Sequence, residues 1–476
     1  TDVKLVGSMI FNSLAFIAFF PLVCIIYFLL PSKFRNYFLL IASYFFYMNW
    51  EPMYALLIFA STATTFACSL FLEKFSNRGK KLILMLSLFI NFGILFTFKY
   101  YNFITESIFA ILQYANVRCE MPKFNLLLPV GISFYTFQAV GYTIDVYKQK
   151  IRAERNFFTY ALFVSFFPQL VAGPIERAKN LLPQFYETHT FSADRCLSAL
   201  KLMLWGYFMK LCIADQISTY VDAVFNNVEN HNGTSMLVAA MFFAFQIYCD
   251  IAGYSLIAIG AAKFLGFNLM ENFRRPYFSM NFREFWHRWH ISLSTWFTDY
   301  VYIPLGGNRV KYARHLFNLL VTFLVSGLWH GANWTFVLWG ATHGMLLIFE
   351  NIFWRLFGKR EIHNLAYRIP KMILVFVVAS FAWIFFRANT VTDAFTIFKC
   401  IFTKSGHLFV NTPIMSQAVI SFVILLLKEI IDEWNLSIHF LNSKRTWWNI
   451  TCSILLICYI ILMGSLEGGQ FIYFQF

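Results

Sequence analysis

Apolar runs recur along the whole chain, and most of them have about 20 residues, enough to cross a lipid bilayer as a helix. The first extends from Met9 to Leu30 and is expected to be retained, because it lacks a clear small-residue cleavage site. Hydrophobic residues make up 59% of the 476 residues and charged residues 13%, too little polar material to cover a soluble protein. Backbone groups in lipid must pair within their own segment, so we predict an all-α, polytopic bundle of transmembrane helices.

The apolar runs set the expected helices. They are residues 9–30, 37–50, 54–72, 82–103, 126–147, 156–173, 198–220, 235–262, 316–330, 332–353, 371–388, 413–431 and 448–466. The stretch 263–315 is too polar for a simple span and too aromatic for a free loop. We therefore expect it to enter the membrane from one side under a cover of protein.

The Lys and Arg residues fall in short clusters between the apolar runs. They can share one face if 156–173 is re-entrant, and the positive-inside rule makes that face cytoplasmic, with an even number of crossings and both ends outside. Because the basic residues do not gather along one helix or arm, the net charge of +14 does not indicate a nucleic-acid partner. Residues 1–8 are set aside as an extension or cloning remnant, and 9–476 is predicted to be one domain, since no linker or repeat divides it.

Two histidines lie in the polar stretch, in the sequence Phe285-Trp286-His287-Arg288-Trp289-His290. Their spacing of three would make them neighbours on a helix and could suit a metal pair. The alternative is an aromatic segment anchored at the membrane interface by tryptophans. No other candidate ligand stands at a recognised spacing, and the nine scattered Cys form no metal or redox motif, so we expect no metal and no bound cofactor.

His330 is the only ionisable residue between Leu316 and Trp339. Two GxxxG pairs surround it, Gly327 with Gly331 and Gly340 with Gly344, and His343 lies within the second. Close helix packing would explain the glycines but not the imidazoles. A neutral imidazole is cheaper to bury than a permanent charge and is suited to general base catalysis. His287, Trp329, Asn333 and His343 are further candidates to line a tunnel.

Arg274, Arg275, Arg288 and Arg309 flank the same region from the side expected to be cytoplasmic. Such a set could hold the phosphates of an anionic nucleotide donor. It could equally serve as topology signal and contact lipid headgroups. No GxSxG or catalytic-Cys signature competes with the histidines for the chemistry.

Five motifs together resemble the membrane-bound O-acyltransferase family over nearly the whole chain. They are Pro129 to Gln138, Phe167 to Ile175, Phe285 to Ser294, Tyr302 to Asn308 and Gly327 to Trp334. The likeness is greatest to the bacterial branch that includes the alginate O-acetylation membrane protein, and smaller to the D-alanyl transfer protein of teichoic acid modification.

The resemblance implies a helical bundle with a central funnel or tunnel, in which His330 matches the family's catalytic histidine and His290 its second active-site position. It also implies an acetyltransferase of the bacterial inner membrane that takes acetyl groups from cytoplasmic acetyl-CoA as donor substrate. The acetyl group would pass across the membrane to an exopolysaccharide or cell-surface glycan through a separate periplasmic or extracellular SGNH-type acetyltransferase.

Three alternatives stay open at the level of sequence. The chain could transfer D-alanyl or another acyl group to a cell-wall polymer. It could also be a transporter or flippase of a lipid-linked sugar, although no inverted repeat is visible. A third reading is a membrane scaffold that only recruits a secreted acetyltransferase. Neither the acceptor nor the oligomeric state can be derived from the residues.

Overall fold

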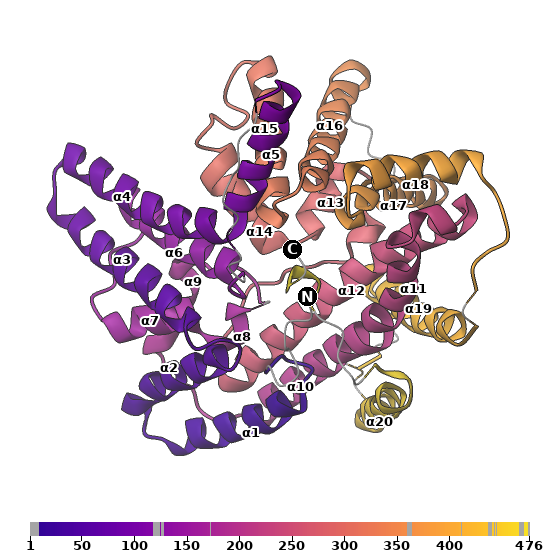
Figure 1. Ribbon diagram of the computed structural model, residues 1–476. Helices are drawn as coiled ribbons and strands as arrows, with labels where there is room; N and C mark the ends of the chain where they lie inside the picture. Colours follow the sequence, from indigo (N-terminus) through magenta and orange to yellow (C-terminus); the bar gives the residue numbers. More distant parts are fainter. Residues whose placement is uncertain are drawn as a thin grey trace. The chain divides into compact units, whose positions relative to one another are not determined.

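The computed structural model describes residues 9–117, 124, 128–171, 173–358, 364–410, 412–436, 440–441, 443, 445–465 and 471–474, and within them all regular structure is helical (Figure 1). The predicted all-α class is therefore confirmed. The chain forms two compact units: unit 1 comprises residues 1–199 and 258–270, and unit 2 comprises 200–257 and 271–476. The single domain over 9–476 stays a prediction, and residues 1–8 lie outside the described residues.

Unit 1 is built mainly from the N-terminal helices. They are α1 (Leu14–Leu29), α2 (Ser32–Met48), α3 (Tyr54–Lys74), α4 (Asn77–Leu95), the π-helix η1 (Phe96–Tyr100), α5 (Tyr101–Tyr114), α6 (Ile132–Tyr147), α7 (Phe157–Ser165), α8 (Phe167–Leu170), α9 (Ala178–Leu181) and η2 (Pro183–Tyr186). Helices α3, α4 and α6 pack on one another. A buried hydroxyl pair joins α7 to α3, since Tyr160 donates to Thr65 at 2.7 Å. This internal pairing satisfies polar groups that lipid cannot.

Two of the sequence motifs meet in the core of unit 1. The side-chain amides of Gln138 and Gln169 both donate to the carbonyl oxygen of Phe163, at 2.6 and 2.8 Å. Gly131 has a φ of +74°, and a Cβ there would come within 2.9 Å of the Leu170 carbonyl oxygen. The motifs are thus packing elements in this unit, and the expected segment 156–173 is broken into α7 and α8.

Unit 2 holds the remaining elements, with α10 and α12 running through both units. They are α10 (Ala193–Tyr207), the π-helix η3 (Phe208–Ala214), α11 (Asp215–Phe225), η4 (Val228–Asn230), α12 (Gly233–Leu265), η5 (Pro276–Phe278), α13 (Phe282–Arg288), α14 (Ile291–Phe297), the π-helix η6 (Thr298–Tyr302), α15 (Tyr312–His330), α16 (Trp334–Phe357), α17 (Leu365–Arg387), α18 (Val391–Thr403), α19 (Thr412–Glu433), α20 (Thr446–Met463) and η7 (Ile472–Phe474). Helix α18 was not expected, although a capping box of Thr390 and Asp393 marks its start.

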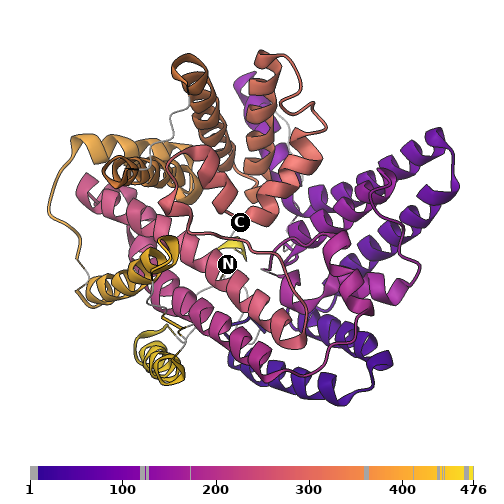
Figure 2. The ribbon, with the colours of Figure 1, turned by 180° about the vertical axis from the view of Figure 1, so that it is seen from behind.

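Helices α15 and α16 form a closely packed hairpin, visible from both sides in Figures 1 and 2. A Cβ on Gly327 would lie 2.3 Å from the Phe336 carbonyl oxygen, and one on Gly340 would lie 2.3 Å from that of Phe323. Real side chains cannot approach a backbone so closely, so the glycines permit this crossing. The packing role of the two GxxxG pairs is confirmed.

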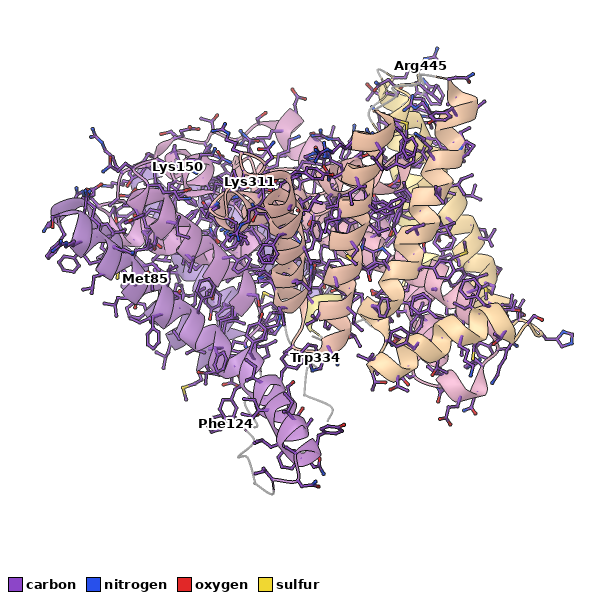
Figure 3. All side chains as sticks on the ribbon, turned by 90° about the horizontal axis from the view of Figure 1, so that it is seen from above. Met85, Phe124, Lys150, Lys311, Trp334 and Arg445 are labelled. Carbon is purple, nitrogen blue, oxygen red and sulfur yellow. The ribbon has the colours of Figure 1, made fainter. Side chains whose placement is uncertain are left out.

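Eight described helices are long and apolar enough to cross a membrane, and α1 is a shorter apolar helix. The chain is therefore a multi-pass membrane protein, while the even number of crossings stays a prediction. In unit 2, Lys311 and Arg445 lie toward one edge and Trp334 toward the opposite one (Figure 3). In unit 1, Lys150 and Phe124 are likewise at opposite edges, with Met85 between. In each unit the labelled basic residues thus lie at the edge opposite the labelled aromatic residue, an arrangement in line with the positive-inside rule.

Candidate active site

The polar stretch before α15 folds inside unit 2. Phe285, Trp289, Leu293 and Trp296 are all buried, which confirms the expected cover of protein. One expectation is wrong: His287 and His290 do not share a helix, because α13 ends at Arg288 and His290 is the N-cap of α14. His287 is exposed while His290 is buried, so the two imidazoles cannot act as the i, i+3 metal pair.

His290 adopts a left-handed backbone conformation, with φ 41° and ψ 55°. A side chain bearing a Cβ is strained there by about 1–2 kcal/mol, so surrounding contacts must hold the turn. Asn272 supplies them. Its carbonyl oxygen accepts from the backbone N–H of Ile291 at 2.8 Å, and its Oδ1 accepts from the Ser292 hydroxyl at 2.9 Å and the Ser292 N–H at 3.3 Å. The Asn272 amide donates to Ser255 on α12 at 2.9 Å.

The imidazole of His290 is kept neutral by its surroundings. It is 1% exposed, and burial lowers its pKa to about 3. Within the described residues neither ring nitrogen makes a hydrogen bond. Both nitrogens are thus available to a group that enters the site, such as a hydroxyl or a carbonyl oxygen.

His330 is the last residue of α15, which ends because Gly331 takes an extended conformation. Asn333 then starts α16, since its side chain accepts the N–H of Thr335 at 3.0 Å. His330 is 3% exposed and is enclosed by aromatic rings. The ring centroids of Trp329 and Trp339 lie 4.9 Å from its own, and that of Phe386 lies 5.3 Å away. This apolar wall excludes water from the imidazole.

Tyr473, in the short C-terminal helix η7, connects the two histidines. Its ring stacks on His330 with a centroid distance of 5.6 Å and meets His290 edge-on at 6.2 Å. The sequence reasoning missed this residue. The signal was present, because Phe471, Tyr473 and further aromatics follow the last span, and a free tail would not be so apolar.

Of the other residues expected to line a tunnel, some lie beside His330 and some lie farther from it. Trp329 contacts both His330 and Tyr473, the latter at 5.9 Å. His343 is fully buried on α16, where its ring is 5.0 Å from Trp339 and Trp286. Asn333 lies at the start of α16 and its amide donates to the Asn389 carbonyl at 3.2 Å. Trp339 therefore separates His343 from His330.

Three of the four arginines chosen from the sequence have carboxylate partners inside unit 2. Arg274 binds Glu271 through two hydrogen bonds, at 2.6 and 3.0 Å. Arg288 binds both carboxylate oxygens of Glu433, at 2.9 and 3.0 Å, and Arg275 donates to the same group at 2.8 Å. Burial alone would lower the pKa of Arg288, but the carboxylates of Glu433 and Glu284 outweigh burial and hold this pKa above its usual range. Arg309 is exposed and makes no ion pair with any described residue.

No group of three or more His, Cys, Asp or Glu among the described residues could hold a metal ion. The side chains gathered at the site are two imidazoles, a phenol and the aromatic rings around His330. Such a site can remove a proton from a hydroxyl and shield an activated acyl group from hydrolysis.

Residues 147–391, which carry both histidines, match the sequence profile of the membrane-bound O-acyltransferase family. The chain belongs to this family. The match runs from the end of α6 to the start of α18, so it includes the elements that carry His290 and His330 but not η7 with Tyr473. The chain is accordingly an O-acyltransferase.

Named relatives place this membrane-bound O-acyltransferase more closely. A protein named as a probable alginate O-acetylase from Azotobacter vinelandii is 38% identical over 83% of this chain and 78% of its own length. Its counterpart in Pseudomonas aeruginosa is 37% identical over 83% of this chain and 75% of that protein. The peptidoglycan O-acetyltransferase of Helicobacter pylori is 31% identical over 98% of both chains. The resemblance to the bacterial alginate-acetylating branch is confirmed.

Proposed function

We propose that this O-acyltransferase takes an acetyl group from cytoplasmic acetyl-CoA and passes it across the bacterial inner membrane for O-acetylation of a cell-surface polysaccharide. The observation that carries the proposal is the enclosed imidazole of His330 at the end of α15, beside His290 and Tyr473. The relatives support the acetyl group and the glycan, since they are named for alginate and peptidoglycan.

In the proposed reaction, His330 acts as general base. It takes the proton of an acceptor hydroxyl as the oxygen attacks the thioester carbonyl, the C–S bond breaks, and coenzyme A leaves as the thiol. His290, with two free ring nitrogens among the described residues, orients the acceptor or donates to the carbonyl oxygen as negative charge develops. The aromatic wall limits hydrolysis by keeping water from the thioester.

The ion pairs of the arginines limit which of them can bind the phosphates of acetyl-CoA. Arg274, Arg275 and Arg288 already neutralise carboxylates, so a phosphate would have to compete with Glu271 or Glu433. Arg309 makes no such pair within the described residues and is free to meet a phosphate. We therefore place the donor contact at Arg309 first.

The donor assignment is tested by charge reversal. Arg309→Glu should raise the KM for acetyl-CoA, with an effect that shrinks at high ionic strength, while folding is retained. Arg288→Glu should mainly destabilise the protein, because it places a third carboxylate beside Glu433 and Glu284. An unchanged KM in the Arg309 variant would remove that residue from the donor site.

The acceptor side involves a separate protein in the proposal. A secreted SGNH-type acetyltransferase would receive the acetyl group outside and complete its transfer to the polysaccharide. Comparison of labelled acetyl-CoA with a D-alanyl carrier protein as donors distinguishes this activity from the alternative D-alanyl transfer. A transporter or scaffold would use neither donor.

The His330 assignment is tested by measuring acetyl transfer from labelled acetyl-CoA in matched amounts of folded protein. His330→Ala should lower the rate by about 10²- to 10⁴-fold, the usual contribution of a general base. His343→Ala is the comparator, because it deletes another fully buried imidazole from the same hairpin but not from the Tyr473 site. Its loss of rate should be smaller. Near-normal turnover by the His330 variant would end the proposal.

A further inference from the structure

Three buried charged side chains lie in unit 2 outside the histidine site. The Lys210 ammonium is 2.7 Å from Asp215 Oδ1 and 2.6 Å from Asp250 Oδ1, and the three residues are at most 8% exposed. Charges within a membrane bundle are expensive to bury, so a group of three calls for an explanation beyond packing.

The chain is shaped to bring these charges together. Lys210 lies in the π-helix η3, and α10 and α12 approach each other just before it. A Cβ on Gly206 would lie 2.6 Å from the Gly253 carbonyl oxygen, and one on Gly253 would lie 2.8 Å from that of Gly206. The glycine pair thus lets α12 present Asp250 directly to Lys210.

One ammonium, that of Lys210, faces two carboxylates in this group. The second oxygen of Asp250, Oδ2, accepts a hydrogen bond from the backbone N–H of Ile472 at 2.7 Å. An N–H that donates to a buried carboxylate makes one of the stronger hydrogen bonds in a protein. Asp250 therefore links Lys210 to the C-terminal segment, with one carboxylate oxygen on each.

Ring contacts also join the Lys210 group to the C-terminal segment. Tyr254, one turn after Asp250 on α12, has its ring 5.1 Å from the Lys210 ammonium and 4.4 Å from the ring of Phe471. Figures 1 and 2 show the short C-terminal helix lying beside α12. The residue after Ile472 is Tyr473, whose ring touches both His290 and His330.

We propose that Asp250, charged and oriented by Lys210, is a positioning residue that fastens the C-terminal segment 471–474 and thereby sets Tyr473 between the two histidines. This inference rests on the proposed function only in treating the histidines as the reaction centre. Since the Tyr473 ring occupies the space beside both imidazoles, its placement decides what else can reach them.

The test compares two substitutions that make the same change in charge. Asp250→Ala and Asp215→Ala each leave Lys210 with one carboxylate, but only the first removes the acceptor of the Ile472 N–H. Docking of the tail is followed by maleimide labelling of Tyr473→Cys in full-length protein carrying Cys458→Ser and Cys119→Ser, because Cys458 is the exposed cysteine among the described residues and Cys119 lies outside them. Transfer is measured in parallel on chains that retain Tyr473.

Loss of a hydrogen bond to a charged group should increase the labelling rate of the Asp250→Ala protein by about 10- to 100-fold, because labelling follows the released fraction. Its transfer rate should fall while the KM for acetyl-CoA is kept. Asp215→Ala should leave the labelling rate within about 2-fold of the parent, since the Ile472 contact is intact. Equal labelling of the two variants would overturn the proposal, and fast labelling with normal transfer would refute the positioning role alone.

A second pair of variants covers the case in which Asp250→Ala does not fold. Ile472→Pro removes the N–H donor itself and leaves all three charges in place, and proline is tolerated in the first turn of a helix. Ile472→Ala keeps the N–H and removes the side chain. Faster labelling and slower transfer in the Pro variant than in the Ala variant support the proposal, and equal behaviour overturns it.

Discussion

Replacement of Asn272 by alanine should release the strained turn that carries His290. The side chain is 2% exposed and makes three hydrogen bonds, two from Ser292 and one to Ser255. At about 1 kcal/mol each, their loss amounts to about 2–3 kcal/mol. That exceeds the strain of about 1–2 kcal/mol that a left-handed conformation imposes on His290, so the turn should relax and the imidazole should leave its place.

Two measurements on detergent-solubilised protein check this expectation. Denaturant unfolding should show the loss of about 2–3 kcal/mol, and acetyl transfer per folded molecule should fall by about tenfold or more, since a shift of one ångström in a catalytic group can have a hundredfold effect. Ser255→Ala is the matched control, because it removes the bond to α12 and leaves both Ser292 contacts.

The control should lose about 1 kcal/mol and keep most of its transfer activity. Equal transfer rates in the Asn272 and Ser255 variants would refute the reasoning that Asn272 holds the catalytic geometry. A destabilised Asn272 variant with normal transfer per folded molecule would show that His290 does not depend on this turn.

Further expectations concern the backbone at His290, helix packing, pH and topology. His290→Gly should be about 1 kcal/mol more stable than His290→Ala, although both lose transfer, because glycine accepts a positive φ without strain. Gly340→Ala should destabilise by about 1–3 kcal/mol because its Cβ would meet the Phe323 carbonyl, whereas Gly93→Ala should not, since nothing lies within 4 Å of that Cβ. Burial raises the pKa of Glu176 to about 7, so the folded protein holds this proton more tightly than the unfolded chain. Stability from this group should be present below pH 4.5 and disappear as pH rises to about 7, and Glu176→Gln should flatten the profile of unfolding against pH. A reporter fused within residues 355–371 should be cytoplasmic and one within 222–234 external, and the reverse labelling would overturn the orientation.

The long helices could be predicted because lipid leaves a chain so few options. Expected residues 54–72, 235–262 and 332–353 correspond to α3 (Tyr54–Lys74), α12 (Gly233–Leu265) and α16 (Trp334–Phe357). In each of them the apolar run itself defines the helix, since every backbone group must pair inside it. The expected start of α6 was several residues early. The helix begins only after Gly131, which has a positive φ and packs against the backbone of Leu170, a contact that the sequence does not reveal.

The candidate site could be predicted in part. His290 and His330 stood out because imidazoles are rare in apolar surroundings, and the structure places both beside Tyr473. The break between His287 and His290 could not be predicted, because it depends on side chains that are distant in the sequence. Asn272 accepts a hydrogen bond from the Ser292 hydroxyl after the turn, and its own amide donates to Ser255 on α12. Aromatic and polar composition alone gives no sign of a left-handed residue.

The charged residues show why basic clusters in a membrane protein cannot be interpreted from sequence alone. Arg288 and Glu433 are 145 residues apart in the chain, yet their side chains form a two-bond ion pair, and Lys210 meets Asp250 from a different helix. A surplus of basic residues in the sequence therefore overstates the positive charge open to a ligand. At Lys210, which meets two carboxylates, the Asp250 carboxylate also accepts a backbone N–H. The ion pairs that form in the fold, more than the net charge of +14, thus determine which charged groups can bind a substrate or hold another segment of the chain in place.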